Sequence, residues 1–460
     1  MQKNVSLEEA QTILLDVAVP MNASTVSLSY ASGRVLGRDV IARYNVPAFK
    51  KSAMDGYAVI ASDTWSASPS QPVGLTVVEE IRAGIVAEKT VTPGTTIKVQ
   101  TGAPIPEGAD AVIKYEDVDR QGDVIFIPLT LHPDENVVPV GEDVKQGDII
   151  ARRGTVITPP MVGVFAGLGM NRVPVFRKVK ISISSTGDEL LHPSQELQAG
   201  KIYNRTFFAL AARCRELGTV PIDMGISPDE VEAISARIAY GLEISDIVIT
   251  TGGVSVGDFD MVEDSLLRAG TRILLRGVAM KPGSPMVAAV KGHKIIIGLS
   301  GNPGAAMTNF ELIVVPLIKT LIGLRQTLPP KFQGIMVDNY PKSSPQRRFL
   351  RARLLRKDGK DFVKLTGAQT NGVLMSMVDY NVLVDIPAGS GPVKFGQEIS
   401  GFLVGSVDQI YRGYGVEGHA GGMGQTALDE RGHAAYLLIP SCNQSTTLEA
   451  PGENGSCNEH

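Results

Sequence analysis

The stretch 246-DIVITTGGVSVGDFDMVEDSL-266 decides the predicted fold, because it runs from an apolar strand through a glycine-rich turn into a helix. Residues 246–251 have the length and β-branched composition of a strand buried on both faces. Adjacent glycines and crowded carboxylates follow at 252–264, and neither stabilises a packed core, since glycine costs backbone entropy and like charges repel. The turn is therefore a candidate ligand site at the end of a buried strand.

The order of strand, turn and helix repeats between residues 175 and 328. We predict strands at 179–186, 220–226, 246–251, 272–280 and 295–300, and helices at 204–217, 229–242, 258–269 and 304–324. This alternation is typical of a mostly parallel sheet joined by right-handed crossovers, whose ligands bind at the carboxyl ends of the strands. The segment is thus predicted to be a central α/β domain.

Shorter apolar runs punctuated by Pro and Gly surround this domain and indicate β-rich modules. A helix is also predicted to begin after Ser6, because Ser6 and Glu9 have the spacing of a capping box. The predicted organisation is an elongated N-terminal subdomain at 1–45 and 141–174, a β-rich subdomain at 46–140, the α/β domain at 175–328, a small barrel-like β domain at 329–405, and a mostly disordered tail at 406–460. The fold class is α/β plus β-rich modules, in an elongated chain of several subdomains.

The composition argues against several classes of function. A net charge of -4 without a basic run gives no electrostatic attraction to nucleic acid. Three cysteines without a CxxC spacing support neither a disulfide framework nor a zinc site, which fits a reducing cytoplasm. The N-terminus turns acidic where a signal peptide would turn apolar, and Pro316 and Lys319 interrupt the apolar stretch 312–324, so we expect no membrane partner.

Three glycine-rich turns follow strands of the predicted α/β domain, at 252–257, 280–285 and 300–304. Alone, each is equally well explained as a tight turn, a helix start or a surface lysine, and none matches the GxGxxG or P-loop pattern. Together at one sheet edge they favour a single phosphate-bearing ligand held by backbone N–H groups. With the turn after the first strand, the candidate substrate-binding residues are Thr186, Gly187, Gly252, Gly253, Ser255, Gly257, Pro282, Gly283, Ser284, Pro285, Ser300, Gly301, Asn302 and Pro303.

Carboxylate side chains gather beside these turns and in other Gly- or Pro-rich loops. Taken singly, Asp55, Asp143 and Glu189 are more simply explained as turn or cap residues. The excess of carboxylates near anion-binding turns favours Mg²⁺, which is commonly held by one or two carboxylates together with ligand phosphates. The candidate metal ligands are Asp188, Asp258 and Asp260. The sequence has no Ser-His-Asp or Cys-His pattern, so covalent nucleophilic catalysis is not indicated.

The chain resembles the molybdopterin molybdenumtransferase family, which includes bacterial MoeA proteins and the E domain of gephyrin. The resemblance covers about residues 5–404 and is carried by seven motifs in the family's order: SAMDGYAV, TGAPIPEGADAV, GEDV, STGDEL, GGVSVGDFD, MKPGSP and LSGNPGAAM. It implies an L-shaped homodimer with four subdomains in each chain. It also implies a transferase that hydrolyses adenylylated molybdopterin, releases AMP and inserts molybdate to give molybdenum cofactor, with Mg²⁺ as the cofactor.

The resemblance further implies roles for individual residues. Asp55 and Thr101 match functional positions that the partner subunit contributes, and Asp143, Glu189, Asp229 and Asp260 match acidic positions of the cleft. Lys281, Arg351 and Ser376 resemble residues that surround molybdate. The catalytic set is therefore Asp55, Thr101, Asp143, Glu189, Asp229, Asp260, Lys281 and Arg351, with Ser376 as a further substrate-binding residue.

Two positions depart from the family pattern. Many members have a lysine where this chain has Ser284 in KPGSP, so one cation near molybdate is missing. Many relatives have a Ser-Asn pair where this chain has Arg205 and Thr206 in 202-IYNRTF-207, which predicts an altered contact to the pterin.

Two other functions are compatible with the motifs, namely a dimeric scaffold of the gephyrin E type and a molybdopterin adenylyltransferase. The acidic cluster with Lys281 and Arg351 favours catalysis over a scaffold, and the flanking β modules argue against a single-domain adenylyltransferase. The expected partners are a second copy of the chain, a molybdopterin adenylyltransferase and proteins that deliver cofactor to molybdoenzymes. The sequence leaves the choice between molybdate and tungstate open.

Overall fold

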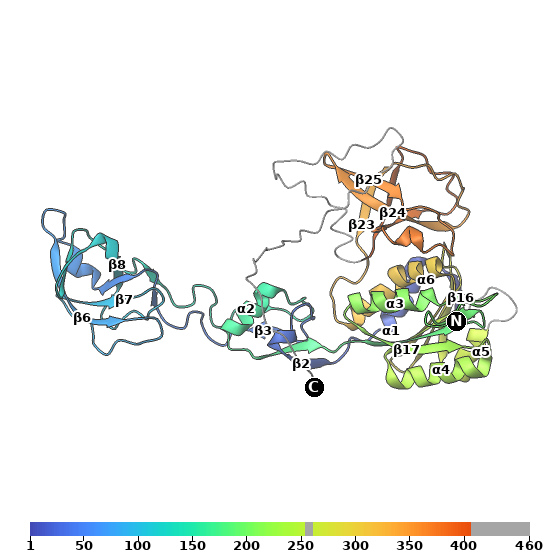
Figure 1. Cartoon of the computed structure of the whole chain (residues 1–460), viewed down its shortest axis with the longest axis horizontal. Coiled ribbons are helices and arrows are strands. Elements are labelled where there is room, and N and C mark those ends of the chain that lie inside the picture. The colour runs from blue at the N-terminus through green and yellow to red at the C-terminus, as the bar shows by residue number, and fades with distance from the viewer. Residues whose placement is uncertain (254–260, 406–460) are drawn as a thin grey trace, which may run out of the picture. The chain divides into compact units, whose positions relative to one another are not determined.

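The computed structural model describes residues 1–253 and 261–405 of the 460. The turn residues Ser255 and Gly257, the carboxylates Asp258 and Asp260, and the predicted tail lie outside the described residues. Within the described part, four modules are distinguished by their own sheets and cores: a small N-terminal module, a β-rich module, an α/β module and a C-terminal barrel (Figure 1).

The α/β module is built on a seven-stranded sheet. Its strands in spatial order are β1 (Gln2–Val5), β19 (Arg272–Val278), β21 (Met286–Lys291), β22 (Lys294–Leu299), β18 (Ile247–Thr251), β14 (Lys180–Thr186) and β17 (Val220–Ser227). The four strands β22, β18, β14 and β17 are mutually parallel, so their carboxyl ends meet at one edge of the sheet. The predicted, mostly parallel α/β domain is thus confirmed.

Helices cover both faces of this sheet (Figure 1). They are α1 (Leu7–Val17), α3 (Arg205–Glu216), α4 (Val231–Ile244), α5 (Met261–Arg268), and α6 (Pro303–Asn309) continued by a π turn (Phe310–Val314) and α7 (Val315–Leu321). In β18, Ile247 and Ile249 pack with α1, α3 and α6–α7, whereas Val248 packs with α4 and α5. A strand that is apolar at successive positions is therefore buried on both faces, as its composition predicted.

The first elements of the chain also belong to this module by their packing. Strand β1 pairs with β19, and α1 buries Leu7, Ala10 and Leu14 in the same core. The predicted capping box is present, because Ser6 accepts from the backbone of Glu9 while the Glu9 carboxylate accepts from the Ser6 backbone. Residues 2–17 therefore pack with the α/β sheet, whereas the sequence grouped them with the N-terminal subdomain.

Two further features of the α/β module differ from the prediction. Strand β21 was not predicted, and it pairs antiparallel with both β19 and β22, which makes the sheet mixed at that side. The helix predicted at 304–324 ends at Leu321 and contains the π turn directly before Pro316, where a proline lacks the N–H of a regular α-turn. By length and composition alone, the helix 303–321 could cross a membrane, yet 89% of its most apolar 18-residue stretch is buried inside the protein.

The two N-terminal modules contain mainly short strands. The β-rich module has a six-stranded sheet in the order β8 (Ala111–Lys114), β5 (Gly56–Val59), β7 (Thr95–Val99), β6 (Val73–Ile81), β10 (Val124–Ile127) and β9 (Asp119–Gln121). The small module has α2 (Pro159–Gly167) and the pairs β2 (Ala23–Ser27) with β13 (Arg172–Phe176) and β3 (Val40–Ile41) with β12 (Ile149–Ala151). The short pair β4 (Lys51–Ser52) with β11 (Val137–Val138) joins the segments that enter and leave the β-rich module. The short pair β15 (Leu190–Leu191) with β16 (Ile202–Tyr203) belongs to the α/β module, between β14 and α3.

The C-terminal module is a closed barrel of five strands. They are β24 (Arg347–Lys357), β25 (Lys360–Leu365), β23 (Lys331–Met336), β27 (Glu398–Leu403) and β26 (Val382–Ile386), and the pairing of β26 with β24 closes the ring. Closure removes the free sheet edges, as expected for a small β domain. The short strand β20 (Met280–Lys281) of the α/β module pairs parallel with β24, so the KPGSP turn begins directly beside the barrel.

Candidate functional site

The carboxyl ends of the parallel strands surround a cavity of about 440 Å³, here called the strand-end cavity. Three of its walls are the ends of parallel strands and the turns that follow them: Thr186 and Gly187 at the end of β14, Thr251, Gly252 and Gly253 at the end of β18, and Ser300, Gly301, Asn302 and Pro303 after β22. The rest of the lining is Asp229 after β17, the β15–β16 pair with Glu189, the start of α3 and Pro285. The turns that the sequence singled out after separate strands are therefore brought together. This is the place where ligands of an open α/β sheet bind.

Glycine at position 252 is required by the close approach of two strand ends. The residue has a φ of +91°, and a Cβ there would lie 2.2 Å from the carbonyl oxygen of Thr186. Its N–H donates to the carbonyl of Leu299, and Gly301 packs against its Cα. The turns after β14, β18 and β22 thus touch one another through backbone atoms and leave backbone groups close to the cavity.

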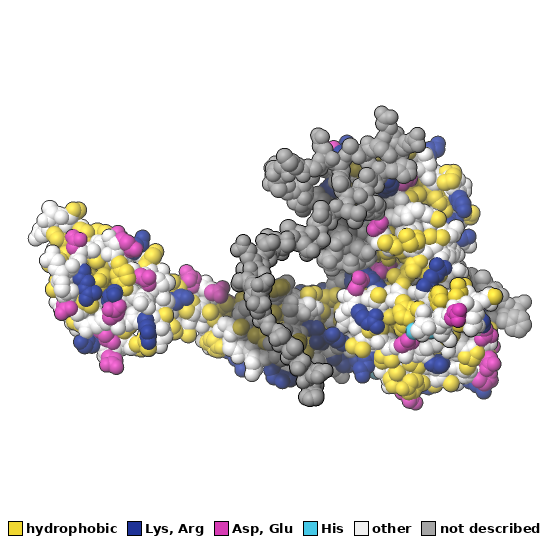
Figure 2. Space-filling model, in the orientation of Figure 1, with side chains coloured by type: hydrophobic (Ala, Val, Ile, Leu, Met, Phe, Trp, Pro, Cys, Tyr) yellow, Lys and Arg dark blue, Asp and Glu magenta, His cyan; other side chains and the backbone are white. Residues whose placement is uncertain are grey.

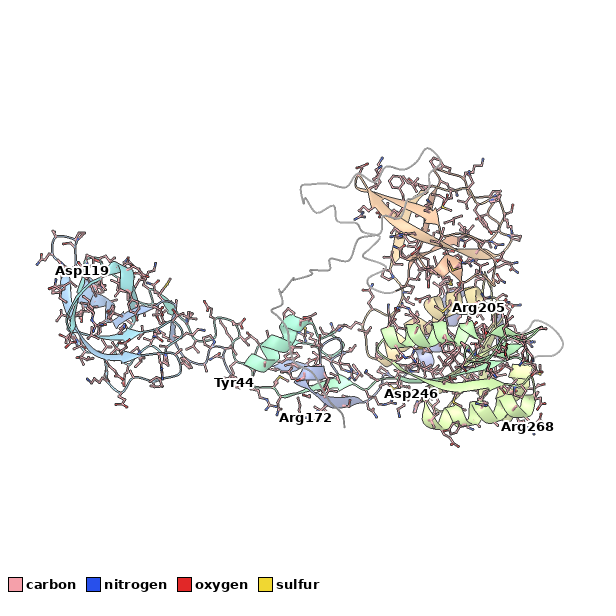
Figure 3. All side chains as sticks on the ribbon, viewed as in Figure 1. Tyr44, Asp119, Arg172, Arg205, Asp246 and Arg268 are labelled. Carbon is pink, nitrogen blue, oxygen red and sulfur yellow. The ribbon has the colours of Figure 1, made fainter. Side chains whose placement is uncertain are left out.

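Two helices begin at the strand-end cavity. Asn302 and Pro303 open the long helix 303–321, and Asn204 to Thr206 open α3 (Figure 3 labels Arg205 there). The N-terminus of a helix carries a partial positive charge and unpaired N–H groups, which favour an anion. In addition, the buried hydroxyl of Thr186 has no hydrogen-bond partner among the described residues. The cavity therefore offers donors suited to a ligand that carries phosphate.

Two carboxylates line the same cavity, those of Glu189 and Asp229. The Glu189 carboxylate folds back over Gly187, where an added Cβ would lie 2.4 Å from Oε2. Asp188 does not line the cavity, and its carbonyl accepts from Lys201 Nζ at 2.5 Å. Residues 1–253 and 261–405 contain no group of three or more His, Cys, Asp or Glu side chains that could hold a metal by themselves. Two carboxylates beside glycine-rich turns do fit Mg²⁺, which commonly takes one or two carboxylates and completes its ligands with phosphate and water.

A second cavity of about 670 Å³ lies beside the barrel, and we call it the barrel cavity. It is lined by Lys281, Tyr340, Lys342, Arg348, Leu365 and the loop from Gly367 to Asn371. The KPGSP turn connects the two cavities, since Lys281 lines the barrel cavity and Pro285 lines the strand-end cavity. Between them, Pro282 and Gly283 are buried, Ser284 is half-buried, and the Gly283 carbonyl accepts from the Asn309 side chain at 2.9 Å.

The loop 367–372 contacts both Arg351 and the helix starts at the strand-end cavity. The carbonyl of Gly372 accepts from Arg205 at 2.9 Å, and the carbonyl of Asn371 accepts from the N–H of Gly304 at 2.9 Å. Through the carbonyls of Ala368 and Thr370 the loop also accepts two hydrogen bonds from Arg351, at 3.0 and 3.1 Å. One short loop thus forms part of the barrel cavity and is tied to two helix starts of the strand-end cavity.

Arg351 lies fully buried beneath this loop, with no exposed surface. Its Nε donates to Ser376 Oγ at 2.8 Å, its Nη1 has no partner among the described residues, and no described carboxylate pairs with it. Burial without a carboxylate lowers the pKa of Arg351 to about 10. The structure therefore brings Arg351 and Ser376 together, behind the wall of the barrel cavity and not among the side chains that line it.

Asp55 and Thr101 meet in the β-rich module. The Asp55 carboxylate accepts from both the N–H and the hydroxyl of Thr101, at 2.6 and 2.9 Å, and these bonds lower the pKa of Asp55. Asp143 is exposed in the connection after that module, where its N–H donates to the Val46 carbonyl. None of the three lines either cavity, and their contribution from a partner subunit stays a prediction.

Several residues of the two cavities were not singled out from the sequence. In the strand-end cavity these include Tyr203 and Thr251, and in the barrel cavity Lys342, Arg348 and Gln369. Thr251 was detectable, because it is the last residue of the strand before the glycine turn. Arg348 was not, since it reaches the cavity only through the pairing of β24 with β20, two segments far apart in the sequence.

Comparison with known families gives consistent matches along the chain. Residues 5–169 match the MoeA N-terminal region (domain I and II), residues 182–320 match a family described as "Probable molybdopterin binding domain", and residues 333–402 match the MoeA C-terminal region (domain IV). The chain is 33% identical over 405 residues to the molybdopterin molybdenumtransferase of Staphylococcus aureus (strain Mu50), covering 87% of this chain and 96% of that one. It is 35% identical over 385 residues to the protein of the same name from Bacillus subtilis (strain 168), covering 82% and 89%.

Solved structures agree with these matches. A molybdopterin biosynthesis MoeA protein from Pyrococcus horikoshii has a TM-score of 0.78 and 30% identity, covering 87% of this chain and 98% of that one. A second structure of such a protein from the same organism has a TM-score of 0.70 and 32% identity, covering 87% and 99%. The likeness therefore spans all four modules and stops before the tail.

Proposed function

The chain belongs to the MoeA family, and on this premise we propose that it is a molybdopterin molybdenumtransferase of molybdenum cofactor biosynthesis. Relatives at 33% and 35% identity carry that name, and the matches extend over nearly their whole length. The observation that supports this function most strongly is the convergence of the turns after β14, β18 and β22 on one cavity with two helix N-termini. Such a cavity suits an anionic pterin joined to a nucleotide.

In this proposal the strand-end cavity binds adenylylated molybdopterin. Gly252 and Gly253 allow the phosphoanhydride to approach the backbone, while the starts of α3 and α6 face its negative charge. Glu189 and Asp229 would hold Mg²⁺, which when bound polarises the phosphoanhydride for hydrolysis with release of AMP. These residues orient the bond that breaks and keep it next to the KPGSP turn, so hydrolysis and molybdate insertion are coupled by position.

Molybdate is the second substrate in the proposal. Lys281 lines the barrel cavity, and Arg351 with Ser376 supports the loop that forms its wall, so fixed positive charge lies where an oxyanion would collect. We further propose that the protein acts as a homodimer in the cytoplasm. In the dimer, Asp55 and Thr101 of one subunit would complete the site of the other, which would explain why neither lines a cavity of its own chain.

The proposal is tested by supplying the purified chain with adenylylated molybdopterin, Mg²⁺ and molybdate. We expect AMP and active cofactor to form together, and chelation of Mg²⁺ to stop both. Asp229→Asn should abolish AMP release without unfolding the protein, whereas Asp264→Asn, an exposed carboxylate of α5 outside the cavity, should leave it unchanged. Normal AMP release by Asp229→Asn contradicts the assignment, and a stable dimer without any AMP release favours the scaffold function.

A further inference from the structure

The barrel cavity gathers three cationic side chains from separate segments of the chain. Lys281 comes from β20, Arg348 from β24, and Lys342 from the segment that precedes β24. None of the ten residues that line the cavity is acidic. The cavity is therefore a concentration of positive charge, on the surface of a protein whose net charge is -4.

The strand pairing forces two of these cations together. Lys281 and Arg348 are directly paired residues of the parallel strands β20 and β24, and both line the same cavity. Like charges directly opposite one another on neighbouring strands destabilise a sheet unless a counter-charge lies between them. Within residues 1–253 and 261–405, neither side chain has an ion-pair partner.

The neighbouring arginine shows that the missing counter-charge is specific to the cavity. Arg347 is held by Asp385 and Glu8, with distances of 2.7 and 2.8 Å. Arg348 instead packs over the Tyr340 ring, and its Nε donates to Ser344 Oγ at 3.1 Å. This contact fixes the guanidinium in place, while its two terminal nitrogens have no hydrogen-bond partner among the described residues. A fixed fork of N–H donors is suited to binding an oxyanion through two oxygens.

We propose that Arg348 and Lys342 act with Lys281 as the residues that first bind the oxyanion substrate. Two of the three groups that the resemblance implies around molybdate, Arg351 and Ser376, are 0% and 1% exposed and cannot meet an ion arriving from solvent. Solvent reaches Lys281 and Lys342, which are exposed, and Arg348, which is half-buried, so these three side chains present the positive charge of the cavity. The ligand class is a small tetrahedral dianion, and its identity as molybdate rests on the proposed function.

Direct binding to the full chain tests the inference without any turnover. Molybdate is titrated calorimetrically into wild type, Arg348→Gln, Lys342→Gln and a matched control, Lys364→Gln, which removes an exposed lysine of the same barrel outside the cavity. We expect Arg348→Gln to weaken molybdate binding by about tenfold or more, because a charge-assisted hydrogen bond is lost. Lys342→Gln should weaken it by about threefold, as expected for an exposed single charge, and Lys364→Gln should have no effect.

Folding and alternative ligands are controlled in the same experiment. Thermal unfolding is measured for each variant, and Arg348→Lys keeps the charge while removing the fork, so it should recover part of the affinity. Sulfate should compete with molybdate, whereas AMP should not compete at this cavity. Unchanged molybdate affinity in folded Arg348→Gln and Lys342→Gln overturns the inference. So does a result in which the wild type binds AMP but not molybdate and loses AMP binding in Arg348→Gln.

The outcome is separable from that of the proposed function. Loss of molybdate binding in Arg348→Gln, in a protein that releases no AMP, would support the anion site and refute the transferase. AMP release with a normal requirement for molybdate in Arg348→Gln and Lys342→Gln would support the transferase and refute the anion site. In an active protein, the KM for molybdate should rise in Arg348→Gln while the KM for adenylylated molybdopterin stays the same.

Discussion

Replacing Arg351 by methionine separates the contribution of the buried guanidinium to folding from its contribution to the site. Arg351 is completely buried and donates to Ser376 and to the carbonyls of Ala368 and Thr370. Ser376 Oγ also lies 3.4 Å from the carbonyl of Val373, so its hydroxyl keeps a partner in the variant. The two loop carbonyls lose theirs, at a cost of about 1–3 kcal/mol for each buried group.

The substitution also removes an unfavourable charge. Burial lowers the pKa of Arg351 from its ordinary value to about 10, which corresponds to roughly 3 kcal/mol of stability that the folded state loses by keeping this group protonated. Because the pKa is lowered, this loss of folding free energy is present at every pH below about 10 and is relieved only as the pH rises above it. The two effects oppose each other, so we expect Arg351→Met to be destabilised by no more than about 3 kcal/mol, by an amount that does not change between neutral and mildly alkaline pH.

Function should respond far more strongly than stability. We expect the melting temperature of Arg351→Met to fall by no more than about 12 °C, because about 1 kcal/mol shifts it by roughly 2–4 °C in a folded unit of more than about 150 residues. Molybdenum insertion should be lost, since both the loop wall and its supporting charge change. Arg353→Met, a partly exposed arginine of the same strand that lines neither cavity, serves as the control. Normal insertion by folded Arg351→Met, or loss of the folded state, would refute this reasoning.

Three further predictions concern other parts of the chain. Gly252→Ala should no longer bind adenylylated molybdopterin in a calorimetric titration, and its free energy of unfolding should fall by at least about 1–2 kcal/mol. The reason is that φ is +91° and the new methyl would lie 2.2 Å from the Thr186 carbonyl oxygen. Glu311→Gln should destabilise the chain by at most about 3–5 kcal/mol in thermal unfolding, since Glu311 is 2% exposed and Arg213 would lose its buried carboxylate partner at 2.7 Å and keep only the exposed carboxylate of Glu216. Asp55→Asn should leave stability unchanged but reduce turnover; its pKa is lowered, so the wild-type pH profile should show no Asp55 step near neutrality.

Much of the α/β module could be predicted because local sequence and tertiary packing agree there. The Ser6–Glu9 capping box fixes the start of α1, and the helix predicted at 204–217 is found at Arg205–Glu216 between its two caps. The glycine turns after β14, β18 and β22 were recognisable because each follows an apolar strand, and parallel strands place such turns at one edge.

The remaining features depend on contacts between distant segments. Strand β21 has the composition MVAAVK, whose small apolar residues carry no strand periodicity, and its partner β22 follows after a two-residue turn. Strand β1 is identifiable only once β19 is known to lie at the edge of the sheet. In the same way, the barrel cavity exists because β20 pairs with β24, a pairing that neither segment indicates alone.

In the proposed function, the strand-end turns form one cavity that receives the nucleotide-bearing pterin. A crystal structure of the full chain with adenylylated molybdopterin tests it most directly. We predict density for the ligand phosphates beside Gly252 and Gly253, within reach of the backbone from Ser300 to Pro303. A ligand bound elsewhere on the protein, with this cavity empty, would contradict the claim.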